Sequence, residues 1–128
     1  MAEAALQTPG ILIVEDSVLL AESLAAFFHD EGFRPVGPYA RVSQALEAIA
    51  RGGIDAAILD VDLGEEGTSI PIAERLEAAG IPAVFLTGRP QHIPQHLRRR
   101  MPVIIKPHDM NELLDTIMRL IGPEAADR

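Results

Sequence analysis

The sequence predicts an α/β fold, a three-layer sandwich in which a five-stranded parallel sheet carries helices on both faces. Four short apolar runs and one further short segment, each bounded by turn-forming residues, alternate with segments whose apolar residues recur at helical spacing. The runs are apolar on successive residues rather than on alternate ones, which is typical of strands covered from both sides. Each connection holds one helix, and such connections favour parallel strands joined by right-handed crossovers.

The predicted strands follow the chain at 11–15, 34–37, 55–60, 82–87 and 102–106. The second strand is short and contains Pro35 and Gly37. Because proline cannot donate to the hydrogen-bonding ladder of a sheet, we expect this strand at a sheet edge.

Helices are predicted over 18–30, 43–51, 69–79, 90–100 and 110–121. The apolar stripe of the first helix consists of Val18, Leu20, Leu24, Phe27 and Phe28. The expected N-caps are Ser17, Ser43 and Asp109, because their side chains can accept from amides of the first turn. The fourth helix is the weakest, since Pro90 and Pro94 allow a helix only from about Pro94 onward.

Length and composition limit the classes of protein that the chain can belong to. The 128 residues suggest one domain over 10–122, with a flexible lead-in at 1–9 and a tail at 123–128. The net charge of −8 disfavours non-specific binding to nucleic acid. No apolar run approaches the ~20 residues of a membrane span, and the N-terminus does not resemble a signal peptide. The absence of cysteine excludes disulfides and thiolate metal sites, and it is consistent with a cytoplasmic location.

Polar residues follow four of the predicted strands at the point where each strand ends. They are Glu15 and Asp16 after the first strand, Asp60 after the third, Thr87 after the fourth and Lys106 after the fifth. In open parallel sheets, sites form at the carboxyl edge of the strands, so we expect these side chains to meet there.

This set of residues suits metal-assisted transfer of a phosphoryl group to a carboxylate. Asp60 is the candidate nucleophile. The three carboxylates would repel one another unless a cation lay among them, and a hard cation such as Mg²⁺ fits oxygen ligands. Thr87 could donate to a phosphoryl oxygen, and Lys106 could pair with Asp60 before transfer and with the phosphoryl group afterwards. Each residue alone also has an ordinary explanation, as a turn aspartate, a helix cap, a strand threonine or a solvated lysine.

The order of these residues along the chain resembles that of the receiver domain of two-component response regulators. The matching stretches are Ile11-Leu12-Ile13-Val14-Glu15-Asp16-Ser17, Ile58-Leu59-Asp60-Val61-Asp62-Leu63, Leu86-Thr87-Gly88 and Ile105-Lys106-Pro107. The resemblance covers about residues 10–121 and implies the flavodoxin-like strand order 2-1-3-4-5. It implies a phosphoprotein in which Asp60 becomes a 4-aspartylphosphate.

The resemblance also implies partners, a cofactor and residue roles. The phosphoryl donor would be a sensor histidine kinase or a histidine phosphotransfer protein, and the output would pass to an unidentified downstream protein. The resemblance implies that Asp16, Asp60 and the backbone carbonyl of Asp62 bind Mg²⁺, and that Glu15 reaches the ion through water. It implies that Thr87 provides the switch hydroxyl and that Lys106 pairs with the phosphoryl group. In that family the peptide bond at the position of Lys106-Pro107 is often cis.

Several positions depart from the usual receiver pattern. Gly64 and Thr68 stand where receivers usually have proline and glycine, so the loop after Asp60 should differ. Val103 stands where many receivers have a switching aromatic residue. The stretch Phe85–Pro90 is similar to that of a stand-alone receiver subgroup with an altered fourth helix, and no output domain is expected after residue 121.

Other residues carry weaker expectations. The four histidines lack metal-ligand spacing, and His108 is expected to be a solvated turn residue. The basic cluster Arg98-Arg99-Arg100 is expected to be a solvated helix end, and a docking site for an acidic partner is the alternative.

Two other functions remain to be weighed. Asp60 and Asp62 also match the nucleophile and the acid–base of haloacid-dehalogenase-like phosphatases, but in those enzymes the motif lies near the N-terminus and an acidic pair follows the lysine. The third possibility is a receiver that serves only as a binding module, and the presence of all five site residues argues against it.

Overall fold

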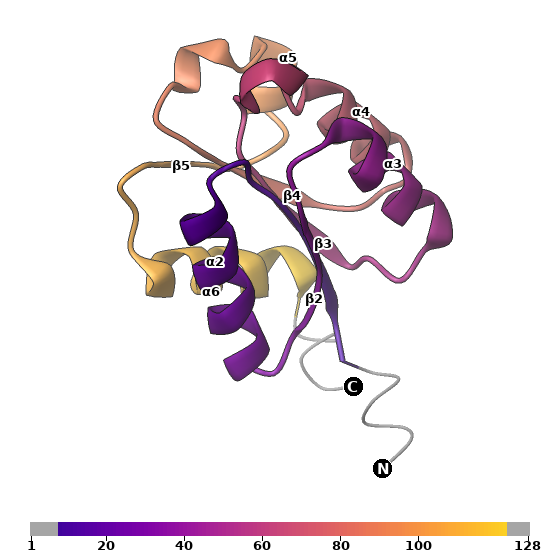
Figure 1. Cartoon of the computed structure of the whole chain (residues 1–128), viewed down its shortest axis with the longest axis vertical. Coiled ribbons are helices and arrows are strands. Elements are labelled where there is room, and N and C mark those ends of the chain that lie inside the picture. Colours follow the sequence, from indigo (N-terminus) through magenta and orange to yellow (C-terminus); the bar gives the residue numbers. More distant parts are fainter. Residues whose placement is uncertain (1–7, 123–128) are drawn as a thin grey trace.

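The structure is a computed structural model that describes residues 8–122, and it confirms the predicted sandwich (Figure 1). The sheet has the order β2-β1-β3-β4-β5 and all neighbouring strands are parallel. The strands are β1 (Gly10–Val14), β2 (Arg34–Tyr39), β3 (Ala56–Leu59), β4 (Ala83–Thr87) and β5 (Val103–Ile105). The second strand lies at an edge, as expected. Most of the predicted lead-in and the predicted tail lie outside the described residues.

Helices cover both faces of the sheet. They are α2 (Val18–Asp30), α3 (Val42–Arg51), α4 (Ile70–Ala78), α5 (Gln95–Arg98) and α6 (Met110–Ile121), with 3₁₀ turns η1 (Gly64–Glu66) and η2 (Pro90–His92). Helices α2 and α6 pack on one face, and α3, α4 and α5 on the other (Figure 1). The weak helix expected from Pro94 is a single turn, preceded by η2.

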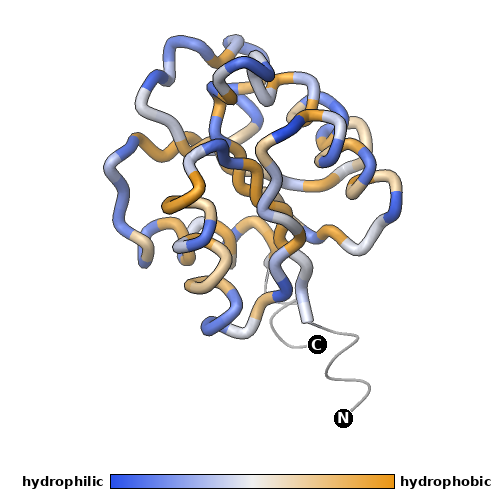
Figure 2. Tube along the Cα trace, in the orientation of Figure 1, coloured by the Kyte–Doolittle hydropathy of each residue, from blue (hydrophilic) through white to orange (hydrophobic). Residues whose placement is uncertain are grey.

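The two faces of the sheet form two hydrophobic cores. Alternate residues of β1 point to opposite faces, so that Leu12 and Val14 join one core while Ile11 and Ile13 join the other. All four are fully buried, which explains why the strand runs are apolar on every residue. Figure 2 shows this apolar centre with hydrophilic residues toward the outer loops and helix surfaces. None of the helices in 8–122 combines the length and the apolar character that crossing a membrane would require.

Two of the three predicted helix caps are confirmed and one is wrong. Ser17 accepts from the Leu20 amide and Asp109 from the Asn111 amide. Ser43 is not a cap, because α3 already begins at Val42. The Val42 amide instead donates to Glu66 Oε1 at 2.9 Å. The sequence pattern missed this acceptor because η1 brings it from the loop after β3.

Two further expectations need correction. Strand β2 continues to Tyr39 instead of ending at Gly37, because the chain passes Gly37-Pro38 as an irregularity in the pairing with β1. Gly37 has a φ of 97°, which glycine adopts without strain. Val18 does not belong to the buried stripe of α2, since 69% of it is exposed. It lies in the first turn of the helix, beyond the core.

Candidate functional site

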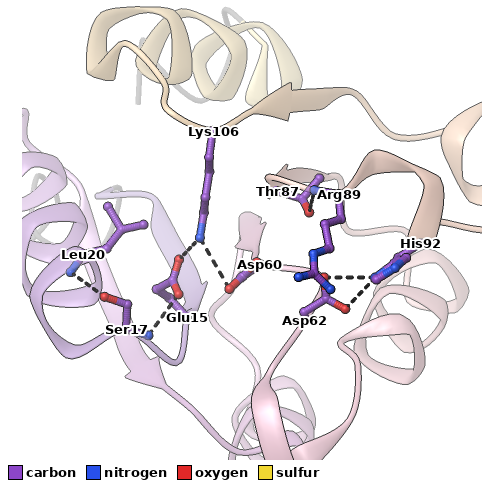
Figure 3. Close-up of polar contacts among 9 residues, drawn as sticks. All are labelled: Glu15, Ser17, Leu20, Asp60, Asp62, Thr87, Arg89, His92 and Lys106. Atoms are coloured by element: carbon purple, nitrogen blue, oxygen red, sulfur yellow. Dashed lines mark hydrogen bonds and ion pairs between the residues drawn. The ribbon is translucent and has the colours of Figure 1, made fainter.

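The polar residues at the strand ends lie together at the carboxyl edge of the sheet, as the sequence predicts (Figure 3). Backbone hydrogen bonds between neighbouring strands continue one residue past the strand ends, and they fix the backbone of three of these polar residues. The Glu15 amide donates to Tyr39 O, the Asp60 amide to Val14 O and the Lys106 amide to Thr87 O, at 3.0, 2.9 and 2.8 Å. The side chains therefore start from rigid backbone, which is what a preorganised polar site requires.

Three carboxylates form a compact acidic cluster, defined by Glu15, Asp16 and Asp60. One oxygen of each lies within 4.8 Å of the others. Glu15 and Asp60 are buried, whereas Asp16 is exposed. Burial, together with the charge and hydrogen bonding of Glu15, raises the pKa of Asp60 to about 7, although Lys106 acts in the opposite direction. The cluster is therefore strained electrostatically by its own negative charge.

Lys106 provides the cation that faces this cluster. Its Nζ lies 2.8 Å from Glu15 Oε1 and 3.4 Å from Asp60 Oδ2. Burial works against the charged ammonium group, but the hydrogen bond and charge of Glu15 outweigh it and raise the pKa of Lys106. The expected contact between Lys106 and Asp60 is present, but the shorter contact is with Glu15.

Glu15 is held in its ionised form by donors on both of its oxygens. Oε1 accepts from Lys106, and Oε2 accepts from the Ser17 amide at 3.0 Å. Burial opposes the charge, yet these hydrogen bonds keep the pKa of Glu15 below its ordinary value. With both oxygens engaged, Glu15 acts as a fixed anion that sets the charge of its neighbours.

Thr87 closes the other side of the site. It is buried, and its Oγ1 accepts from the Arg89 amide at 2.9 Å. That contact uses only an oxygen lone pair, so the hydroxyl hydrogen can still be donated. Next to it, Gly88 has open space where a Cβ would stand, in agreement with the room expected beside Thr87.

The side chain of Asp62 lies outside the acidic cluster. Both of its oxygens contact Nδ1 of His92, at 2.9 and 3.1 Å (Figure 3). Sequence reasoning missed His92, because a histidine 30 residues away carries no spacing signal. The role that the resemblance implies for Asp62 belongs to its backbone carbonyl, and the contact with His92 involves only the side-chain oxygens.

The loop after Asp60 is a tight turn that approaches the cluster. Asp62 and Thr68 form an isolated antiparallel bridge, and η1 lies between them. A Cβ on Gly64 would stand 3.4 Å from Asp16 Oδ2. Gly64 and Gly67 have φ of 61° and 90°, so glycine meets a conformational need at both positions.

The acidic cluster fits a hard divalent cation. Its donors are carboxylate oxygens, which Mg²⁺ prefers, and a cation among them would offset the burial and the repulsion that together raise the pKa of Asp60. Asp16, the exposed member, could bind an ion that keeps several of its waters.

Two expectations for residues outside the acidic cluster can be compared with the structure. His108 is not a fully solvated turn residue, because Nε2 is buried without a hydrogen-bond partner and burial lowers the pKa of the imidazole. In the basic cluster, Arg100 forms an ion pair with Glu77 at 2.8 Å. Residues 98–100 are exposed, as expected of a helix end.

A sheet of order 2-1-3-4-5 with a buried aspartate after its central strand, an acidic pair, a threonine and a lysine defines the receiver class of signalling domain. The chain belongs to the response regulator receiver domain family, whose model matches residues 11–118. As a member of that family it is a phosphoacceptor signalling domain of two-component systems, a family that interacts with histidine kinases and downstream effectors.

Individual proteins agree with this assignment. The solution structure of SdrG from Sphingomonas melonis Fr1 is 40% identical, covers 91% of this chain and 98% of that one, and has a TM-score of 0.77. The BeF3-activated conformation of SdrG, reported from Pseudomonas melonis Fr1, is 42% identical over 88% of this chain and 96% of that one, with a TM-score of 0.70. The aerobic respiration control protein ArcA of Escherichia coli K12 is 29% identical over 111 residues, 84% of this chain and 46% of ArcA. The chain thus spans about half the length of the curated relatives that it matches.

Proposed function

We propose that Asp60 accepts a phosphoryl group from the phosphohistidine of a sensor histidine kinase or a histidine phosphotransfer protein. The observation that carries this assignment is the position of Asp60. It is buried after the central strand, within reach of Lys106 and inside the acidic cluster. Aspartate nucleophiles form acyl phosphates in other phosphoryl transfers.

In the proposed reaction, a carboxylate oxygen of Asp60 attacks the phosphorus, the phosphorus–nitrogen bond of the donor breaks, and the imidazole leaves. Lys106 would exchange its contact with Asp60 for one with the phosphoryl group, and Thr87 would donate its hydroxyl hydrogen to a phosphoryl oxygen. Asp16, Asp60 and the backbone carbonyl of Asp62 would hold Mg²⁺, with Glu15 acting through water. When bound, this ion neutralises charge on the phosphoryl oxygens.

The proposed output is a contact with a downstream protein. We infer a switch in the cytoplasm that assists its own phosphorylation and dephosphorylation but does not turn over an external substrate. Family membership favours this function over the haloacid-dehalogenase-like alternative. The side chain of Asp62, which would be the acid–base of that enzyme, is instead paired with His92.

Stoichiometry separates the two chemistries. The protein is incubated with acetyl phosphate and Mg²⁺, and its intact mass is followed over time. One phosphoryl group per chain that is slowly lost supports the switch. Repeated turnover of p-nitrophenyl phosphate would support the phosphatase instead.

The proposed ligand assignment predicts which of two substitutions weakens Mg²⁺ binding more. Asp16→Asn should weaken Mg²⁺ binding and slow phosphorylation by acetyl phosphate, because it removes the charge of a direct ligand. Glu15→Gln should weaken binding less, since Lys106 and the Ser17 amide already occupy its oxygens. Calorimetric titration with Mg²⁺ measures both affinities. The opposite ranking would show that the ligands are assigned wrongly.

Thr87→Ala should accept phosphate but fail to transmit it. Thr87 Oγ1 holds the Arg89 amide, so a hydroxyl that turns toward the phosphoryl group would alter the backbone of the next segment. Hydrogen exchange with and without beryllofluoride should therefore change across 88–100 in the wild type and much less in Thr87→Ala. Equal changes in the two proteins would remove the hydroxyl from the mechanism.

A further inference from the structure

The contact between Asp62 and His92 joins two loops that lie on the same side of Asp60. An ionised carboxylate can only accept, so Nδ1 of His92 carries the hydrogen and donates to the two Asp62 oxygens. Each of the two side chains is 39% exposed. Burial therefore does not force them together, and the hydrogen bond itself sets the direction of the Asp62 carboxylate.

The direction of this carboxylate matters because Asp62 is only two residues from Asp60. In Figure 3, Asp62 lies beside Asp60 on the side away from Lys106 and points toward His92. Within residues 8–122, the closely spaced carboxylates are those of Glu15, Asp16 and Asp60, without that of Asp62. His92 thus holds a fourth carboxylate just outside the acidic cluster.

A fourth carboxylate in the cluster would have two opposite effects. It would add a hard oxygen donor and a negative charge near the divalent cation, which strengthens cation binding. It would also repel the anionic phosphoryl donor as that donor approaches Asp60. Cation affinity would rise while the rate of phosphoryl uptake falls, a combination that general damage to the site would not produce.

We propose that His92 is a positioning residue that holds the Asp62 carboxylate outside the acidic cluster, and that this keeps phosphoryl uptake by Asp60 fast. The inference rests on the proposed role of Asp60, and it assigns a role to the segment after β4, which contains His92. The residue acts through Asp62 and is not expected to touch the phosphoryl group.

The test replaces His92 by leucine, which fills similar space but cannot donate. Calorimetry with Mg²⁺ alone and the rate of labelling by acetyl phosphate at saturating Mg²⁺ are measured on the full chain. In His92→Leu we expect Mg²⁺ to bind roughly three- to tenfold more tightly and labelling to slow by a similar factor. A factor of this size is expected from one added negative charge whose effect is screened by solvent. In the Asp62→Asn background, the same His92→Leu change should alter neither quantity.

Two further variants serve as controls. His92→Asn places an amide nitrogen near the position of Nδ1, so it should restore both quantities toward those of the wild type. His96→Leu is the matched control, because His96 of α5 also faces a carboxylate, that of Glu74 in α4, at 3.7 Å, and Glu74 is not a member of the acidic cluster. It should leave Mg²⁺ affinity and labelling rate unchanged.

The outcomes separate this inference from the proposed function. If His92→Leu matches the wild type, or if affinity and rate fall together, His92 does not position Asp62 and the inference is overturned. The same holds if His92→Leu has its full effect in the Asp62→Asn background. Labelling that persists in Asp60→Asn would instead overturn the proposed function, and the inference with it.

Discussion

Asp60→Asn should abolish labelling by acetyl phosphate and Mg²⁺. Asparagine has almost the shape of aspartate, but its amide lacks the anionic oxygen that attacks phosphorus. The surrounding residues offer no substitute. Glu15 is engaged by Lys106 and the Ser17 amide, and Asp16 is exposed to water. Intact mass after a fixed incubation should show one phosphoryl group on the wild type and none on Asp60→Asn.

Asp30→Asn is the matched control for this experiment. It makes the same chemical change at the exposed end of α2, remote from the site, so its labelling should equal that of the wild type. A second check is removal of the cation with EDTA, which should stop labelling of the wild type. Labelling that continues in Asp60→Asn, or that ignores EDTA, would place the acceptor elsewhere.

The same substitution should stabilise the protein when no divalent cation is present. Burial and Glu15 raise the pKa of Asp60 from an ordinary value of 3.8 to about 7. An acid whose pKa is higher in the folded state is favourable for folding at low pH, and that advantage is lost as the pH rises through the folded value. At pH 8 the ionised Asp60 should cost at most about 4 kcal/mol of folding free energy, the equivalent of a rise of about three pKa units, and asparagine avoids this cost.

The pH dependence gives this prediction a clear signature. The difference in unfolding free energy between Asp60→Asn and the wild type should be near zero at pH 4, grow between pH 4 and 7, and stay constant above. Urea unfolding followed by circular dichroism in EDTA measures it at each pH. Adding Mg²⁺ at pH 8 should reduce the difference, because the cation stabilises the wild-type carboxylates. A difference that is independent of pH would contradict the electrostatic origin.

The sequence was sufficient to predict the strand ends, because parallel strands carry all their carboxyl ends to one edge. The order of residues along the chain is therefore enough to group Glu15, Asp60, Thr87 and Lys106 at that edge. Their pairing could not be predicted. Lys106 lies closer to Glu15 than to Asp60, a matter of side-chain packing that residue order does not encode.

Contacts between segments distant in the chain also could not be predicted from the sequence. The pairing of Asp62 with His92 and of Glu66 with the Val42 amide depends on how turns fold in space, 30 and 24 residues apart in the chain. Ser43 looked like the better cap because local side chains are the usual acceptors at a helix start. At α3 a distant carboxylate takes that place.

The Glu66 contact makes the loop after the acceptor strand and the beginning of α3 a single unit for engineering and for evolution. A loop grafted over 63–68 from a relative without this carboxylate would leave the Val42 amide without its acceptor. The reverse graft, a new start for α3, would free Glu66 in a turn that borders Asp16. Chimeras between receivers should therefore exchange both segments together, although they lie 24 residues apart in the sequence.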